Sequence, residues 1–316
     1  METLPPYPNG WYAVGFSDEL PRRRVISRRF MGAEIVLYRT ASGVARAVDA
    51  HCPHLGAHLG IGGRVDGEVL VCPFHGFAYG DGGTCVRTGY GTKPPAAARL
   101  REHELRETNG ILLVHHDSAG CPPGWVVPEL DSRGWTQVQR RTFELRDHPQ
   151  ETTENSVDIG HFAFVHDYRD ATLAHEAEVD GPHLKVGVAA RRRLPYIGRV
   201  LRDRRMSFQF DIDIWGLGYS LVHVHVPALR LDARLWVLAT PIDERSLTLR
   251  MAASVRKKRP GIVYGLLGWF MLSSFAHDAQ QDFPIWENKR YVDKPALAAG
   301  DGPIGLYRRW AKQFYG

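Results

Sequence analysis

The first 120 residues contain short runs in which apolar and polar side chains alternate. Runs of this kind, bounded by glycine, serine and proline, are typical of β-strands, and we predict strands over residues 11–16, 24–30, 33–38, 44–49 and 112–116. The steps Met31-Gly32 and Ser42-Gly43 are predicted to be hairpin turns. The pattern therefore predicts an antiparallel all-β module in this part of the chain.

Alternation returns in the second half, where we predict five more strands over residues 183–190, 206–214, 219–226, 234–240 and 247–254. Consecutive strands joined by short turns form an antiparallel sheet, which can keep one face in water. We expect the other face to be covered by a helix over 152–165, with Thr152 or Thr153 as its N-cap, and by the run 261–291.

A linker rich in glycine and proline at residues 120–124 separates these two patterns. The chain has 316 residues, enough for two domains that each bury a core. We therefore predict an α+β protein with an all-β domain over 1–125 and an antiparallel sheet covered by helices over 126–316.

The most apolar run, residues 262–276, is too short for the roughly 20 residues that cross a bilayer, so a buried helix is predicted. The basic residues 256–259 precede it, and a helix lying on a membrane surface is the alternative. The first residues lack the pattern of a signal peptide, and Cys85 and Cys121 are expected to be free thiols, so a cytoplasmic location is expected, with or without peripheral membrane contact.

Charge adds little to this picture. The net charge is +5, and no basic motif interleaved with aromatic residues accompanies it, so nucleic-acid binding is not indicated. The arginine-rich run 191–205 is predicted to be a solvated face or a docking surface for an acidic redox partner.

Two short motifs carry the most specific chemistry. Cys52-Pro53-His54 is followed, after 17 intervening residues, by Cys72-Pro73-Phe74-His75. One cysteine and one histidine in each loop fit a 2Fe–2S cluster in which histidine replaces cysteine on one iron. A structural zinc site is the alternative, but zinc sites usually pair like with like, and proline and glycine here favour a loop that wraps sulfur with backbone N–H groups.

A second group of donors follows in the sequence E-N-S-V-D-I-G-H-F-A-F-V-H, residues 154–166. His161 and His166 are five residues apart, so they reach one metal ion only if the helix unwinds or bulges between them. With a carboxylate from elsewhere they would form the facial triad of a non-haem Fe(II) oxygenase, which leaves positions open for O2. His223 and His225 share a strand face but are not expected to be ligands.

With both motifs, the chain resembles the oxygenase α subunits of the Rieske non-haem iron oxygenases over essentially its whole length. The second motif reads N-x-x-D-x-x-H-x4-H at Asn155, Asp158, His161 and His166. The resemblance implies a Rieske domain followed by a helix-grip-like catalytic domain. It also implies a third iron ligand near the C-terminus, which we assign to Asp282 in the sequence Q-D-F-P-I-W, with Asp278 as the alternative.

The resemblance further implies the reaction and the partners. Two electrons from NAD(P)H would pass through a flavin reductase, with or without a ferredoxin, to the cluster and then to the mononuclear Fe(II) that uses O2. In the family this transfer crosses a subunit boundary in a head-to-tail homotrimer, where Asp158 would bridge a cluster histidine to an iron-ligating histidine. Asn155 would hydrogen-bond O2 or its water, or cap the helix.

The cluster loops most resemble the steroid branch, the cholesterol 7-desaturases and the 3-ketosteroid 9α-hydroxylases, and this implies a bulky hydrophobic sterol or steroid. A monooxygenase acting on another polycyclic or aromatic natural product is the alternative, and an electron-transfer protein without the second iron is a third reading. Hydroxylation, desaturation and demethylation all stay open. Candidate cavity-lining residues on the predicted sheet are Trp215, Leu217, Tyr219 and Trp236.

Overall fold

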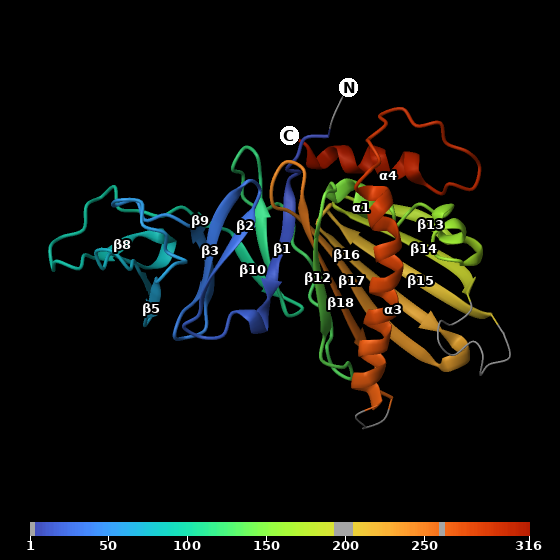
Figure 1. Cartoon of the computed structure of the whole chain (residues 1–316), viewed down its shortest axis with the longest axis horizontal. Coiled ribbons are helices and arrows are strands. Elements are labelled where there is room, and N and C mark those ends of the chain that lie inside the picture. The colour runs from blue at the N-terminus through green and yellow to red at the C-terminus, as the bar shows by residue number, and fades with distance from the viewer. Residues whose placement is uncertain (1–3, 193–204, 259–262) are drawn as a thin grey trace. The chain divides into compact units, whose positions relative to one another are not determined.

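The computed structural model describes residues 4–192, 205–258 and 263–316 (Figure 1). It divides into two compact units. One comprises Tyr12–Glu129 with Ile242–Glu244, and the other comprises Met1–Trp11, Leu130–Pro241 and Arg245–Gly316. The expected α+β fold is confirmed, although most of the regular structure is strand.

The smaller unit is all-β and contains three small antiparallel sheets, ordered β1-β11-β10, β2-β3-β4-β9 and β5-β6-β7-β8. Every strand predicted in this part of the chain is present. The strands are β1 (Gly10–Phe16), β2 (Val25–Phe30), β3 (Ala33–Arg39), β4 (Ala45–Asp49), β5 (Arg64–Asp66), β6 (Val69–Val71), β7 (Ala78–Tyr79), β8 (Cys85–Arg87), β9 (Glu102–His103), β10 (Leu105–Thr108) and β11 (Ile111–His116).

Strand β3 is buried on both faces, which explains its continuous apolar run. Successive side chains on a strand point to opposite faces. Ile35 and Leu37 accordingly pack in one core cluster with Tyr12 and Leu112, whereas Val36 and Tyr38 pack in another cluster that also contains Cys52 and Cys72. The sheet thus anchors the two cysteine loops to a rigid core.

The larger unit is built on a seven-stranded antiparallel sheet, ordered β12-β18-β17-β16-β15-β14-β13. The five predicted strands form its centre: β14 (His183–Arg192), β15 (Met206–Trp215), β16 (Tyr219–Val226), β17 (Leu231–Pro241) and β18 (Leu247–Val255). The prediction missed both edge strands, β12 (Gln139–Leu145) and β13 (Arg169–Asp180). Edge strands carry many charged and polar residues, and these two lack the apolar pattern on which the prediction relied.

Helix α3 (Val263–Trp286) runs across one face of this sheet and contacts β12, β17 and β18 (Figure 1). It extends ten residues beyond the apolar run that predicted it, and Ile262 lies outside the described residues. Within the described part of the chain, no helix combines the length and apolar character needed to cross a membrane. The last α-helix along the chain is α4 (Ile304–Ala311). In the two units together, 3-10 turns occur at Ser17–Glu19, Asp81–Gly83, Pro227–Leu229 and Lys312–Phe314.

The predicted helix over 152–165 is wrong in its extent and in its cap. The structure has two short helices instead, α1 (Pro149–Glu154) and α2 (His161–Phe164), with a non-helical segment between them. His148 is the N-cap of α1, because its Nδ1 accepts a hydrogen bond from the backbone N–H of Gln150 at 3.1 Å. Proline suits the first turn of a helix, where its missing N–H is not needed, and this places the start at Pro149.

Asp147, just before α1, supports a pH prediction. Burial raises its pKa to about 7, and the carboxylate accepts a hydrogen bond from the Thr152 hydroxyl at 2.6 Å. In the unfolded chain the pKa of aspartate is about 3.9, so folding favours the protonated form. We expect the free energy of unfolding to fall by about 1–3 kcal/mol as the pH rises from the unfolded pKa toward and through the folded pKa of about 7. The variant Asp147→Asn should not show this loss. Urea unfolding at pH 5.5 and 8 measures it; an equal pH dependence in the variant would contradict the assignment.

Candidate metal centres

The structure brings together His161, His166 and Asp282, the three residues to which the family resemblance assigned the iron. One nitrogen of each imidazole and one carboxylate oxygen of Asp282 lie within 4.8 Å of one another. The Nε2 of His166 is 3.3 Å from Oδ2 of Asp282, and these two side chains are 7% and 6% exposed. Helix α2 ends at Phe164, before His166, and this lets His166 turn toward His161. On a continuous helix the two side chains would point in different directions.

The second nitrogen of each ring is held by a hydrogen bond directed away from this point. Nδ1 of His161 lies 2.7 Å from the carbonyl oxygen of Asp158, and Nδ1 of His166 lies 3.0 Å from Oε1 of Gln281. Carbonyl oxygens only accept, so each Nδ1 carries the proton of its neutral imidazole. The Nε2 lone pairs therefore face the point between the three donors, where a metal ion would take the place of the Asn155 N–H that Nε2 of His161 accepts at 3.1 Å.

Asn155 and Asp158 complete the surroundings of the three donors. The Asn155 amide Nδ2 donates to Oδ2 of Asp282 and to Nε2 of His161, both at 3.1 Å. Oδ1 of Asp158 accepts the backbone N–H of His161 at 3.2 Å, and its side chain is 32% exposed. Burial raises the pKa of Asp158, but hydrogen bonds and charge from His161 outweigh burial and hold the pKa below its usual value.

The donor set fits a cation. Burial lowers the pKa of His166, but the hydrogen bond and charge of Asp282 outweigh burial and raise the pKa above its ordinary value. A buried carboxylate beside an imidazole therefore draws positive charge to this point, which a divalent ion supplies. Two imidazoles and one carboxylate are the donors of a non-haem Fe(II) site with open positions.

Gly302 holds the segment before α2 in place. Its φ is +90°, and a Cβ on it would lie 2.2 Å from the carbonyl oxygen of Val157. The neighbouring Asp301 carbonyl accepts the backbone N–H of Ile159 at 3.0 Å. The C-terminal loop thus packs directly against the backbone that leads to His161.

We expect Gly302→Ala to lower the unfolding free energy by about 2 kcal/mol or more and to lower the occupancy of the mononuclear site, because neither backbone can yield. Gly305→Ala on the adjacent helix is the matched control, since its Cβ would meet only ordinary contacts and alanine favours helix. Thermal unfolding and iron content measure both variants. A Gly302→Ala protein as stable as Gly305→Ala would refute this role.

An apolar cavity adjoins the three donors. Strands β15, β16, β17 and β18 supply Ile212, Val222, Leu235, Val237 and Leu249, and α3 supplies Phe275 and Trp286. The predicted lining residues are wrong: Trp236 and Tyr219 point to the other face, where the indole N–H donates to the Tyr219 hydroxyl at 2.8 Å. Side chains alternate between faces, so a choice one residue out of phase selects the wrong face.

The two cysteine loops have matching backbone structures. In the first, the N–H of Cys52 donates to the carbonyl of Ala57 at 2.9 Å, and that of Gly56 donates to the carbonyl of Cys52 at 2.9 Å. The second repeats this pattern from Cys72 to Phe77, at 2.8 Å, and from Gly76 to Cys72, at 3.2 Å. Gly56 and Gly76 both have positive φ, 75° and 67°, which the tight turn requires.

Only the second of these loops joins a hairpin, β6 to β7, whereas the first connects strands of two different sheets. The two loops therefore do not both project from hairpins. An isolated bridge between His51 and His58 closes the first loop instead. The two loops thus have the same backbone hydrogen bonds, although one lies within a hairpin and the other connects two sheets.

The four side chains of these loops converge. The His54 and His75 rings lie 4.7 Å apart, and both cysteine sulfurs are buried free thiols. Burial raises the pKa of the Cys72 thiol, and the neighbouring Cys52 raises it further. Nδ1 of His75 is buried and has no hydrogen-bond partner within the described ranges. Paired buried thiols beside an unpartnered imidazole nitrogen fit a metal cluster that binds thiolates.

Other candidate donors are placed differently. Asp278 pairs with Arg192 rather than with the histidines, and His223 and His225 pair with Asp213 and Asp232. Of the arginine-rich run, residues 193–204 lie outside the described part of the chain.

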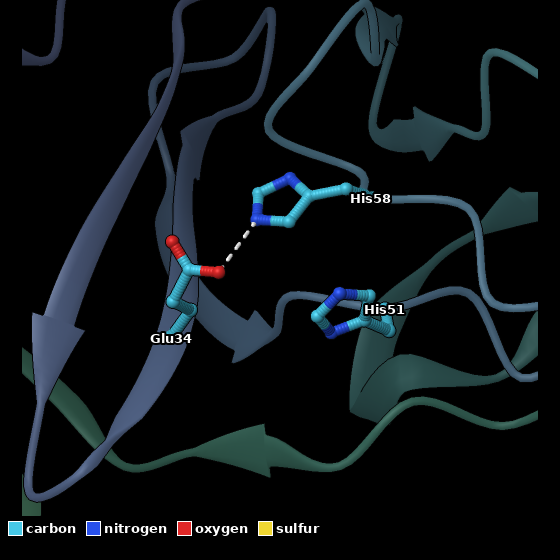
Figure 2. Close-up of side chains that lie close together, drawn as sticks. All are labelled: Glu34, His51 and His58. Atoms are coloured by element: carbon cyan, nitrogen blue, oxygen red, sulfur yellow. Dashed lines mark ion pairs between the residues drawn. The ribbon is translucent and has the colours of Figure 1, made fainter.

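A second group of potential ligands, Glu34, His51 and His58, was missed (Figure 2). Nδ1 of His58 accepts the N–H of Gly60 at 3.1 Å, so its Nε2 carries the proton and faces Glu34 at 3.4 Å. With Nδ1 occupied and Nε2 protonated, His58 directs no lone pair at Glu34, and the contact between them is an ion-pair distance.

The comparisons with known proteins identify the family. Residues 10–101 match the model of the Rieske [2Fe-2S] domain, and residues 114–315 match that of the 3-ketosteroid 9alpha-hydroxylase C-terminal domain. This chain belongs to the Rieske oxygenases. Cholesterol 7-desaturase of Xenopus laevis is 31% identical over 99% of this chain and 73% of its own length. The oxygenase component of 3-ketosteroid-9-alpha-monooxygenase of Rhodococcus rhodochrous is 27% identical over 98% and 81%.

Among solved structures, dicamba monooxygenase bound to dicamba has the same fold, with a TM-score of 0.77 and 20% identity over 97% of each chain. As a Rieske oxygenase the protein is an oxidoreductase that uses O2, a Rieske 2Fe–2S cluster and a mononuclear iron, with electrons supplied by a reductase system. The expected family, its steroid branch and its cofactors are thereby confirmed.

Proposed function

We propose that this Rieske oxygenase hydroxylates or desaturates a sterol or steroid, with His161, His166 and Asp282 holding the iron and Cys52, His54, Cys72 and His75 holding the cluster. The observation that carries the proposal is the apolar cavity with the three convergent donors in its wall. A bulky hydrophobic substrate gains binding free energy from such walls. Relatives of this protein are named for cholesterol and for a 3-ketosteroid, and these names support a sterol or steroid as the substrate.

Bound iron supplies the O2 chemistry, and the chain's own residues prepare its site. Asp158 and Gln281 fix the two imidazoles through their Nδ1 atoms, and the amide of Asn155 donates to Oδ2 of Asp282. The surrounding walls are aliphatic and aromatic. A substrate carbon held against the donors would therefore lie in a mostly apolar site whose ligands are held in place.

The test is a single-turnover experiment on the holoenzyme. The protein is reduced under anaerobic conditions, mixed with a panel of sterols and steroids, exposed to O2, and its products are identified by mass spectrometry. Stoichiometric product from a steroid supports the proposal. No product from any steroid, with product from another polycyclic or aromatic compound, would favour the alternative substrate class instead.

We further propose a head-to-tail homotrimer in which Asp158 bridges neighbouring subunits, with electrons arriving from a flavin reductase directly or through a ferredoxin. The partly exposed carboxylate of Asp158 supports this assembly, because a side chain already bonded to His161 keeps one edge open to a neighbour. Sedimentation of the holoenzyme measures the oligomeric state; a monomer at micromolar concentration would refute the trimer.

Peripheral membrane contact of a cytoplasmic protein is also proposed. Leu266 and Trp269 of α3 are 70% and 56% exposed, and the exposed basic residues Arg256, Lys257 and Lys258 precede this helix. Aromatic and basic side chains together bind anionic membrane surfaces. We expect Trp269→Glu to lower cosedimentation with phosphatidylserine vesicles about tenfold, because it replaces an apolar contact with a like charge. Equal binding by both proteins would contradict the contact.

A further inference from the structure

A carboxylate lines the cavity one helical turn before Asp282. Asp278 on α3 forms an ion pair with Arg192, whose Nη1 donates to Oδ2 at 2.5 Å. The other oxygen, Oδ1, is buried and has no hydrogen-bond partner among the residues that the structure describes. A buried acceptor left without a donor is costly, so it marks a place where a bound molecule can contribute one.

The walls around this carboxylate are apolar and continuous with those near the iron donors. Phe210, Leu235 and Phe275 line both the cavity at the donors and its extension toward Arg192. The guanidinium lies 4.9 Å from the centre of the Tyr168 ring, and its positive charge faces Oδ2. Asp278 therefore presents one fixed acceptor oxygen within a hydrophobic surface.

We propose that Oδ1 of Asp278 accepts a hydrogen bond from a substrate hydroxyl, so that the enzyme selects a 3-hydroxysteroid over the corresponding 3-ketosteroid. This inference rests on the proposed steroid oxidation. A hydroxyl group donates a hydrogen bond to Oδ1, whereas a ketone has no proton and sets its oxygen against another acceptor. Sites built to bond a substrate hydroxyl discriminate strongly against analogues that lack it.

The spacing along α3 also affects which substrate carbons lie near the iron donors. Asp278 and Asp282 are four positions apart in sequence, which is about 6 Å along the helix axis. A hydroxyl held at Asp278 thus presents carbons about two fused rings away to the iron donors. The same contact that selects the substrate would fix which ring is oxidised.

The first test uses the wild-type holoenzyme and three ligands that differ only at one carbon: 5α-cholestan-3β-ol, 5α-cholestan-3-one and 5α-cholestane. Quenching of tryptophan fluorescence in cyclodextrin solution gives their dissociation constants, since Trp286 lines the cavity. We expect the alcohol to bind at least about tenfold more tightly than the ketone. Equal binding, or tighter binding of the ketone, overturns the inference and leaves the proposed function standing. Binding of none of them overturns the steroid class itself.

The second test removes the acceptor. Asp278→Asn offers an N–H₂ group that can donate to a ketone, and we expect the preference for the alcohol to fall to within about threefold. A lone buried guanidinium can impair folding, so the double variant Arg192→Gln/Asp278→Asn is measured beside it. Asp293→Asn, at an exposed aspartate, is the matched control and should keep the wild-type preference. An undiminished preference in both Asp278 variants overturns the role of this carboxylate.

Discussion

Replacing Asp282 by alanine is expected to empty the mononuclear iron site and abolish product formation, while the cluster keeps its spectrum. The carboxylate is one of three protein donors and the only charged one, and it lies 3.3 Å from Nε2 of His166. Its loss removes a ligand and the negative charge that offsets a divalent cation. We expect iron affinity and turnover to fall by at least about a hundredfold, since loss of a supporting contact alone costs 10–100-fold.

Two measurements separate this expectation from unfolding of the protein. Iron content beyond the cluster should fall to that of the apoprotein, and the absorbance and paramagnetic resonance of the reduced cluster should match wild type. Asp282→Glu keeps the charge and should restore part of the iron, and Asp293→Ala is the control for an exposed aspartate. Full retention of mononuclear iron in Asp282→Ala would mean that another carboxylate completes the site.

The cluster ligands could be predicted from sequence because their chemistry is local. Cys52 and His54 share one loop, and Cys72 and His75 share another, so spacing alone indicates a mixed cluster. Asp282 is 116 residues from His166, and only the family resemblance pointed to it. Gln281 was missed as the hydrogen-bond partner of His166, although a carboxamide next to a predicted ligand was a usable signal.

The cavity walls could not be predicted from the strand pattern, for a physical reason. In β16 and β17 both faces carry apolar residues, so alternation does not say which face meets the helices. Val222 and Leu235 line the cavity, whereas Tyr219 and Trp236 bond to each other on the opposite face. The position of α3 determines which face of the sheet lines the cavity, and that position is a property of the assembled fold. The non-helical segment between α1 and α2 likewise depends on tertiary packing, here against Gly302.

Replacing Asp158 by asparagine is expected to leave both metal sites loaded yet to uncouple them. The carbonyl oxygen of Asp158, which survives the substitution, is what holds Nδ1 of His161 at 2.7 Å. Asparagine can also accept the backbone N–H of His161 that Oδ1 now accepts at 3.2 Å. Iron binding should therefore stay within about threefold of wild type, since the contacts that orient the ligand persist. The lost feature is the negative charge on a partly exposed side chain, which we propose faces a cluster histidine of a neighbouring subunit.

The decisive measurement is the rate at which the reduced cluster is reoxidised when substrate and O2 are added. We expect that rate to fall at least about a hundredfold in Asp158→Asn, because the negative charge that we propose bonds a cluster histidine of the neighbouring subunit is replaced by a neutral amide. Asn155→Ala gives the contrast, since its amide donates directly to the iron-site carboxylate of Asp282 and its loss should lower iron content first. If Asp158→Asn instead loses iron while its cluster reoxidises at the wild-type rate per bound iron, the carboxylate serves the iron site of its own chain and not a path between subunits.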